Sequence, residues 1–80
     1  MRYILFTKET CIYCERSIKY LESNDLVFNV VNFEEEQQAV LEQIKLAYDW
    51  STVPMIFERD GNKINFVGGY TDLVEHLKDG

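Results

Sequence analysis

Hydrophobic residues form two kinds of pattern along the chain: short continuous runs and repeats with helical spacing. Four β-prone runs have the length of strands. They span Arg2 to Thr7, Leu26 to Phe33, Met55 to Glu58 and Lys63 to Val67. Elsewhere, apolar residues recur every three to four positions, as on one face of a helix. This spacing predicts helices over Ile12 to Ser23, Glu35 to Tyr48 and Thr71 to Lys78.

Each predicted helix carries one stripe of side chains that we expect to face the core. The stripes follow the i, i+3, i+4 and i+7 spacing that brings side chains to one face of a helix. In chain order, their members are Cys14, Ile18, Leu21, Gln37, Val40, Leu41, Ile44, Ala47, Tyr48, Leu73, Val74 and Leu77.

Turn and capping residues separate these elements. Thr10 stands just before the first helix, where a threonine hydroxyl can cap free backbone N–H groups. Asn24-Asp25 predicts the turn ahead of the second strand. Asp60-Gly61 predicts a tight hairpin between the last two strands, because such a turn needs residues that tolerate positive φ.

The order of elements, β-α-β-α-β-β-α, predicts an α/β domain. The first βαβ unit should be right-handed, which makes its two strands parallel. The hairpin then adds two antiparallel strands, giving a four-stranded mixed sheet flanked by three helices, with helices on both faces. At 80 residues, the chain is expected to form one domain over residues 1–80.

Charge and hydropathy exclude several classes of partner. The net charge of −6 disfavours nucleic-acid backbones and anionic membranes, so we expect neither as a partner. The first residues contain no apolar run long enough for a signal peptide or a membrane span. We therefore expect a cytoplasmic protein, in a compartment that keeps thiols reduced.

Both cysteines lie in the stretch TCIYCERS, as Cys11 and Cys14. They could form half of a metal site, a structural staple or a redox-active dithiol. A tetrahedral zinc site needs four ligands, and the chain adds only one histidine, His76, so we expect no metal site. A bridge between residues three apart closes a tiny loop and so stabilises the fold little. A compartment that keeps thiols reduced also disfavours a structural disulfide.

A redox dithiol fits the position of the pair better. A Cys-x-x-Cys motif that follows a strand and opens a helix within a βαβ pattern is typical of thioredoxin-like redox proteins. Free N–H groups and the helix dipole favour a thiolate there, and such cysteines have pKa values lowered to about 3.5–7.5. Cys11 is therefore the expected nucleophile, with Lys8 adding positive charge. Cys14 shares the buried stripe, so it should lie deeper and resolve the intermediate.

Two further stretches help to distinguish among the families of thioredoxin-like redox proteins. They are STVPMIF at residues 51–57 and VGGYTDL at residues 67–73. With the cysteine pair, they give the chain a sequence that resembles the glutaredoxin family over essentially its whole length. The resemblance implies a thioredoxin fold. The small size and acidic charge are similar to those of phage or bacterial members, which would place a phage-encoded protein in the host cytoplasm.

The resemblance also implies a glutathione-binding site, residue by residue. Pro54 matches the family's cis-proline opposite the dithiol, and the Val53 backbone would pair with the cysteinyl part of glutathione. Residues after the Gly-Gly pair would hold the γ-glutamyl end, while Lys8 would face the glycyl carboxylate. Thr71 and Asp72 could equally act as helix caps. The full predicted set is Lys8, Tyr13, Thr52, Val53, Pro54, Gly69, Tyr70, Thr71 and Asp72.

By the same resemblance, the chain would be a monomeric dithiol glutaredoxin that uses glutathione as reductant or cosubstrate. It would reduce protein disulfides and glutathione mixed disulfides, with ribonucleotide reductase as a family-typical acceptor. Two other readings stay open: a [2Fe–2S] cluster held between two subunits, and reduction by thioredoxin reductase instead of glutathione. Ile12, where the family usually has proline, and Asp49, whose charge would disfavour glutathione's carboxylates, support the reductase reading.

Overall fold

The computed structural model describes residues 1–79, and its elements follow the predicted order β-α-β-α-β-β-α. A short 3₁₀ turn, η1 (Glu35–Gln37), comes before the second helix. The strands are β1 (Arg2–Lys8), β2 (Phe28–Phe33), β3 (Met55–Asp60) and β4 (Lys63–Gly68). The α-helices are α1 (Ile12–Ser23), α2 (Gln38–Ala47) and α3 (Tyr70–Asp79).

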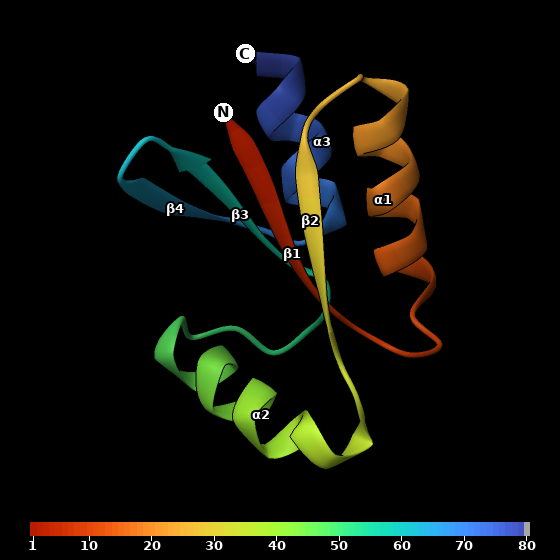
Figure 1. Ribbon diagram of the computed structural model, residues 1–80, viewed down its shortest axis with the longest axis vertical. Helices are drawn as coiled ribbons and strands as arrows, with labels where there is room; N and C mark the ends of the chain where they lie inside the picture. Colours follow the sequence, from red (N-terminus) through yellow and green to blue (C-terminus); the bar gives the residue numbers. More distant parts are fainter. Residues whose placement is uncertain (80) are drawn as a thin grey trace.

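The four strands form one mixed sheet in the order β2-β1-β3-β4 (Figure 1). Strand β1 pairs in parallel with β2 and antiparallel with β3, so Leu5 lies between Val30 and Ile56. The β3–β4 hairpin turns at Gly61-Asn62, one residue later than predicted, because Asp60 still pairs with Lys63. Gly61 provides the positive φ, 62°, that the turn requires.

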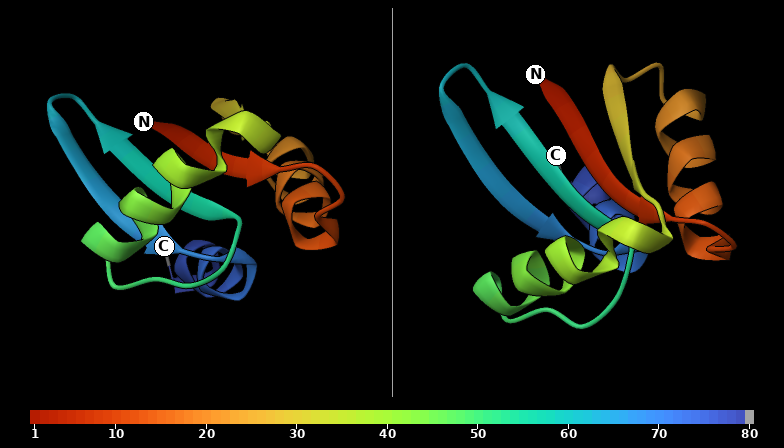
Figure 2. Two further views of the ribbon diagram at one scale, coloured as in Figure 1. Left: turned by 90° about the horizontal axis from the view of Figure 1, so that it is seen from below. Right: turned by 60° about the horizontal axis from the view of Figure 1, so that its bottom comes forward.

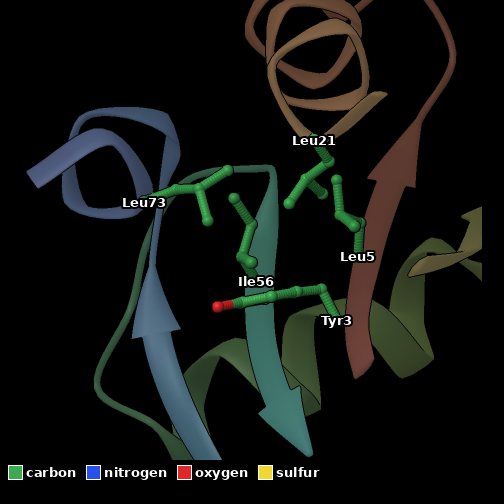
Figure 3. Packing of buried hydrophobic residues seen from close by; sticks show 5 residues of the cluster. All are labelled: Tyr3, Leu5, Leu21, Ile56 and Leu73. Atoms are coloured by element: carbon green, nitrogen blue, oxygen red, sulfur yellow. The ribbon is translucent and has the colours of Figure 1, made fainter. Parts of the chain in front are cut away.

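One face of the sheet is covered by α1 and α3. Side chains alternate between the two faces of a strand, so Tyr3, Leu5 and Ile56 share this face. Leu21 from α1 and Leu73 from α3 pack on them, and all five are at most 2% exposed. Figure 3 shows these five side chains meeting between the sheet and the two helices. This cluster therefore anchors α1, the helix that carries both cysteines.

The opposite face is covered by α2, which lies in front of the strands in the right-hand view of Figure 2, with α3 behind them. Leu41 packs there with Phe33, Met55 and Phe57. The predicted stripe on α2 is partly wrong. Val40 is 57% exposed, Ala47 is exposed and Gln37 belongs to the 3₁₀ turn, because α2 meets the sheet along a narrower line through Leu41, Ile44 and Lys45.

A small polar network lies at the edge of the core cluster between the sheet and helices α1 and α3. The Tyr3 hydroxyl donates to Glu58 Oε2 at 3.1 Å, and His76 pairs with the same carboxylate. His76 thus has a structural role at the surface. Burial, and then the hydrogen bond and charge of Glu58, raise the pKa of Tyr3 to about 12.

This raised pKa predicts that the free energy of unfolding falls at alkaline pH, and that Tyr3→Phe should remove this fall. The unfolded chain releases the tyrosine proton near pH 10, whereas the folded chain holds it until about pH 12. Tyr3 therefore stabilises the fold fully below pH 10, and this contribution of about 2–3 kcal/mol is lost between pH 10 and 12. Urea unfolding across this range should show the loss in the wild type. An equal loss in Tyr3→Phe would contradict the assignment.

Candidate functional site

The chain leaves β1 at Lys8 and turns through Glu9 and Thr10 into α1. The prediction that Thr10 caps α1 is wrong. Thr10 has a φ of +51°, whereas an N-cap residue needs extended backbone, and its hydroxyl donates to the Glu9 carbonyl at 2.7 Å. Cys11 is the N-cap instead: its backbone is extended, and its Sγ accepts a hydrogen bond from the Cys14 N–H at 3.2 Å.

The two cysteines form a disulfide, with their Cα atoms 5.2 Å apart. Their surroundings differ. Cys11 is half-buried at the start of α1, while Cys14 faces the core and is only 4% exposed. A reaction partner in solution therefore has better access to the sulfur of Cys11.

The start of α1 also favours negative charge on the Cys11 sulfur once the disulfide is reduced. N–H groups in the first turn of a helix have no partner within the helix, and the positive end of the dipole lies there. The Cys14 N–H already points at the Cys11 sulfur. These donors stabilise a thiolate, which is the reactive form in thiol–disulfide exchange.

Val53 and Pro54 lie across from the dithiol. The peptide bond between them is cis, and Pro54 is buried just ahead of β3. The Val53 carbonyl oxygen is 3.8 Å from the Cys11 sulfur. The main chain of Val53 therefore forms the wall next to the more accessible sulfur.

Beside this wall is a concavity of about 300 Å³. It brings together eight of the nine residues predicted to bind glutathione, although their contact with glutathione remains a prediction. The chain segments that form it are the start of α1, the loop before β3 and the start of α3. Its lining residues are Tyr13, Trp50, Thr52, Val53, Pro54, Gly69, Tyr70, Thr71 and Asp72. We call this concavity the cis-proline groove.

Lys8 is the predicted residue that lies elsewhere. It is the exposed last residue of β1 and lines two other hollows, of about 250 and 310 Å³. The second of these also contains Cys11, Cys14 and Glu15, on the side of α1 that faces β2. Lys8 is thus near the dithiol but separate from the cis-proline groove.

Asp72 acts as a helix cap, one of the two roles considered for it. Its Oδ2 accepts a hydrogen bond from the Gly69 N–H at 2.9 Å, an arrangement that satisfies a free donor at the start of α3. Gly68 makes room for this contact. Its φ is +123°, and a Cβ atom there would lie 2.5 Å from Asp72 Oδ2.

Gly68→Ala should therefore destabilise the protein by about 1–3 kcal/mol, since it combines an unfavourable φ with a clash. Thermal unfolding measures this loss. Gly61→Ala is the matched control, because Gly61 also has positive φ but a Cβ there meets nothing within 4 Å. Equal destabilisation by both substitutions would show that the clash with Asp72 contributes nothing.

Trp50 lines the groove although it is not among the residues predicted to bind glutathione. Its ring packs edge-on against Phe66, with centroids 5.1 Å apart, and it borders the core cluster beneath α2. It also lines the groove, and its indole Nε1 is buried without a hydrogen-bond partner among residues 1–79. In the sequence, the only indication that Trp50 lines the groove is its position two residues before Thr52.

The groove offers little positive charge. Its lining, drawn from the described residues, includes neither lysine nor arginine, and Asp72 is its one charged side chain. Asp49 lies outside the lining, just beyond α2, with a φ of +52°. Asp72, rather than Asp49, thus supplies negative charge at the groove itself.

Two further structural features concern metals and membranes. Among the side chains of residues 1–78, no group of three or more His, Cys, Asp and Glu is placed to hold a metal ion. Over the same residues, no helix combines the length and apolar character needed to cross a bilayer.

Comparison with models of protein families shows which family the chain belongs to. A family model described as Glutaredoxin matches residues 4–63. The chain belongs to the glutaredoxin family. A search of curated protein sequences finds no match. As a family member, the protein is a glutaredoxin-type thiol–disulfide oxidoreductase, and Cys11 and Cys14 are its redox-active pair.

Solved glutaredoxin structures share the fold over nearly the whole chain. A glutaredoxin from Brucella melitensis is 25% identical with a TM-score of 0.76, covering 100% of this chain and 82% of that one. A buckwheat glutaredoxin–glutathione complex is 24% identical with a TM-score of 0.79, covering 98% and 69%. The NrdH-redoxin from Escherichia coli, described as glutaredoxin-like with a thioredoxin-like activity profile, is 19% identical with a TM-score of 0.66, covering 96% and 95%.

Proposed function

We propose that this glutaredoxin reduces protein disulfides and glutathione mixed disulfides, and that glutathione restores its dithiol. The observation that carries the proposal is the unequal placement of the two sulfurs. Cys11 is accessible at the start of α1, whereas Cys14 is buried one helical turn behind it. One sulfur is thus suited to attack a substrate and the other to complete the reaction.

In the first step, the Cys11 thiolate attacks one sulfur of the substrate disulfide. The substrate S–S bond breaks, the leaving sulfur takes up a proton, and a mixed disulfide joins Cys11 to the substrate. Strand-like hydrogen bonds to the Val53 backbone would hold an extended substrate in place, since that backbone lies beside the reacting sulfur.

In the second step, Cys14 loses its proton and attacks the Cys11 sulfur. The remaining substrate sulfur leaves as a thiol, and the Cys11–Cys14 disulfide forms. Two glutathione molecules then reduce this disulfide by the same exchange and become glutathione disulfide. Family potentials of about −200 to −230 mV favour that direction in a reduced glutathione pool.

Glutathione is proposed as reductant on three grounds. The chain belongs to the glutaredoxin family, one structural neighbour is a glutathione complex, and eight of the nine predicted contact residues line the cis-proline groove. Reduction of a small mixed disulfide in the presence of glutathione, glutathione reductase and NADPH tests the idea. The proposal expects NADPH oxidation that depends on both the protein and glutathione. No protein-dependent oxidation would refute it.

A second candidate reductant is a thioredoxin reductase, acting on the same dithiol. The absence of lysine and arginine from the described lining of the groove favours it, because the carboxylates of glutathione gain no ion pair there. Comparing turnover with each electron donor, at equal protein concentration, separates the two. Ribonucleotide reductase is the first protein substrate to try in both assays, as a family-typical acceptor.

A further inference from the structure

A further concavity, of about 360 Å³, adjoins the cis-proline groove along α1. Arg16, Lys19, Tyr20 and Ser23 line it from α1, and Tyr70 lines it from the start of α3. The four α1 residues lie on the face of the helix that turns away from β2. We call this concavity the basic pocket, because both of its charged residues are cationic.

The basic pocket adjoins the groove at a cluster of tyrosine side chains. Tyr70 lines both concavities. Its ring lies 6.0 Å from the ring of Tyr13 and 6.3 Å from that of Tyr20, measured between centroids. The Arg16 guanidinium lies 5.2 Å over the Tyr13 ring, a cation–π contact that fixes its position at the junction.

The cations of the basic pocket are available to a ligand. Among residues 1–78, whose side chains the structure describes, the ion pairs are Lys45 with Glu42 and His76 with Glu58, so neither Arg16 nor Lys19 forms an ion pair there. This is notable in a chain with a net charge of −6.

The other side of the dithiol has the opposite balance. There, the hollow next to β2 contains Glu9 and Glu15 with a single cation, Lys8. The charged side chains therefore change from mainly acidic in the hollow next to β2 to basic in the pocket lined by α1 and Tyr70. Such an asymmetry orients a charged partner and raises its rate of encounter.

We propose that the basic pocket binds an acidic side chain of the disulfide-bearing polypeptide, close in sequence to the cysteine under attack. The inference rests on the proposed function and specifies its substrate class. Arg16 and Lys19 follow Cys11 by five and eight residues, which is about 8 and 12 Å along the helix axis. An extended chain advances about 3.3 Å per residue, so the acidic residue stands about two to four positions from the cysteine.

The test uses disulfide-bonded peptides that carry either Glu or Gln three positions from the cysteine, on one side or the other. At low salt, kcat/KM for one Glu peptide should exceed that for its Gln counterpart by about three- to tenfold. The ratio should fall as salt is added, because exposed charges are screened. In the Arg16→Gln/Lys19→Gln double variant, it should fall to about one.

The matched control is Arg59→Gln/Lys63→Gln, which removes the same charges at the far end of the β3–β4 hairpin and should leave the ratio unchanged. Charge reversal, Arg16→Glu/Lys19→Glu, should make a Lys peptide the better substrate. Equal turnover of Glu and Gln peptides by the wild type would overturn the inference but leave the proposed function intact. Failure to reduce any of these peptides would overturn the proposed function itself.

Discussion

Cys11→Ser is expected to reduce disulfide-reducing activity by several orders of magnitude, to the background of uncatalysed exchange. A serine hydroxyl is not ionised at neutral pH, so the donors at the start of α1 have no thiolate to stabilise. Cys14 cannot replace it, because that sulfur is 4% exposed. Loss of a catalytic nucleophile has effects of this size in other enzymes.

Cys14→Ser is the matched variant. It should retain much of the activity toward glutathione mixed disulfides, for which a second glutathione can resolve the intermediate. It should lose most activity toward protein disulfides, which need the resolving thiol. The assay is glutathione-dependent turnover of both substrate types by both variants. Full activity of Cys11→Ser on either substrate would overturn the assignment of roles.

Leu21→Ala is expected to have the largest effect on stability. Leu21 is fully buried and joins α1 to the sheet and to α3 (Figure 3). Shortening such a side chain costs about 2–5 kcal/mol, through lost burial and the cavity left behind. In a chain of this size, that lowers the melting temperature by at least about 8 °C. A helix held less firmly would also place the dithiol less accurately against Val53.

Val40→Ala controls for this substitution, because Val40 is also apolar but 57% exposed on α2. It should change the melting temperature by no more than a few degrees. Comparable losses from the two substitutions, measured by thermal unfolding, would mean that the cluster around Leu21 does not dominate the stability of the fold.

The pattern of apolar residues and turns was sufficient to predict the order of elements and the four-stranded mixed sheet, but not the strand order β2-β1-β3-β4. The runs that form β2 and β3 have clear turn signals beside them, Asn24-Asp25 and Asp60-Gly61, and the βαβ handedness rule leaves few ways to connect the strands. The cysteine motif also predicted the different burial of Cys11 and Cys14, because the residues that accompany Cys14 at helical spacing, Ile18 and Leu21, pack on the sheet.

Tertiary packing decided the features that the sequence did not predict. Val40 has the helical spacing of a core residue, but α2 contacts the sheet along a line that leaves it in solvent. Thr10 has the chemistry of an N-cap, but the chain reverses direction at that residue and the extended conformation moves to Cys11. Local preference gives way in both places to the path the backbone must follow.

The site was predicted best where residues are adjacent in the sequence, as Thr52, Val53 and Pro54 are. It was predicted less well where loops from different elements meet. Trp50 lines the groove because the loop before β3 brings its ring toward Gly69, where a Cβ atom would lie 3.7 Å from it. Lys8 turns to the other side of the dithiol. No spacing rule relates such residues, so their placement required the structure.

The central claim is that Cys11 attacks first and Cys14 resolves, and trapping the intermediate tests it most directly. Cys14→Ser, mixed with glutathione disulfide at neutral pH, should quickly gain the mass of one glutathionyl group, and peptide mapping should locate it on Cys11. Cys11→Ser under the same conditions should react far more slowly. A rapid adduct on Cys14, or equal rates for the two variants, would contradict the account.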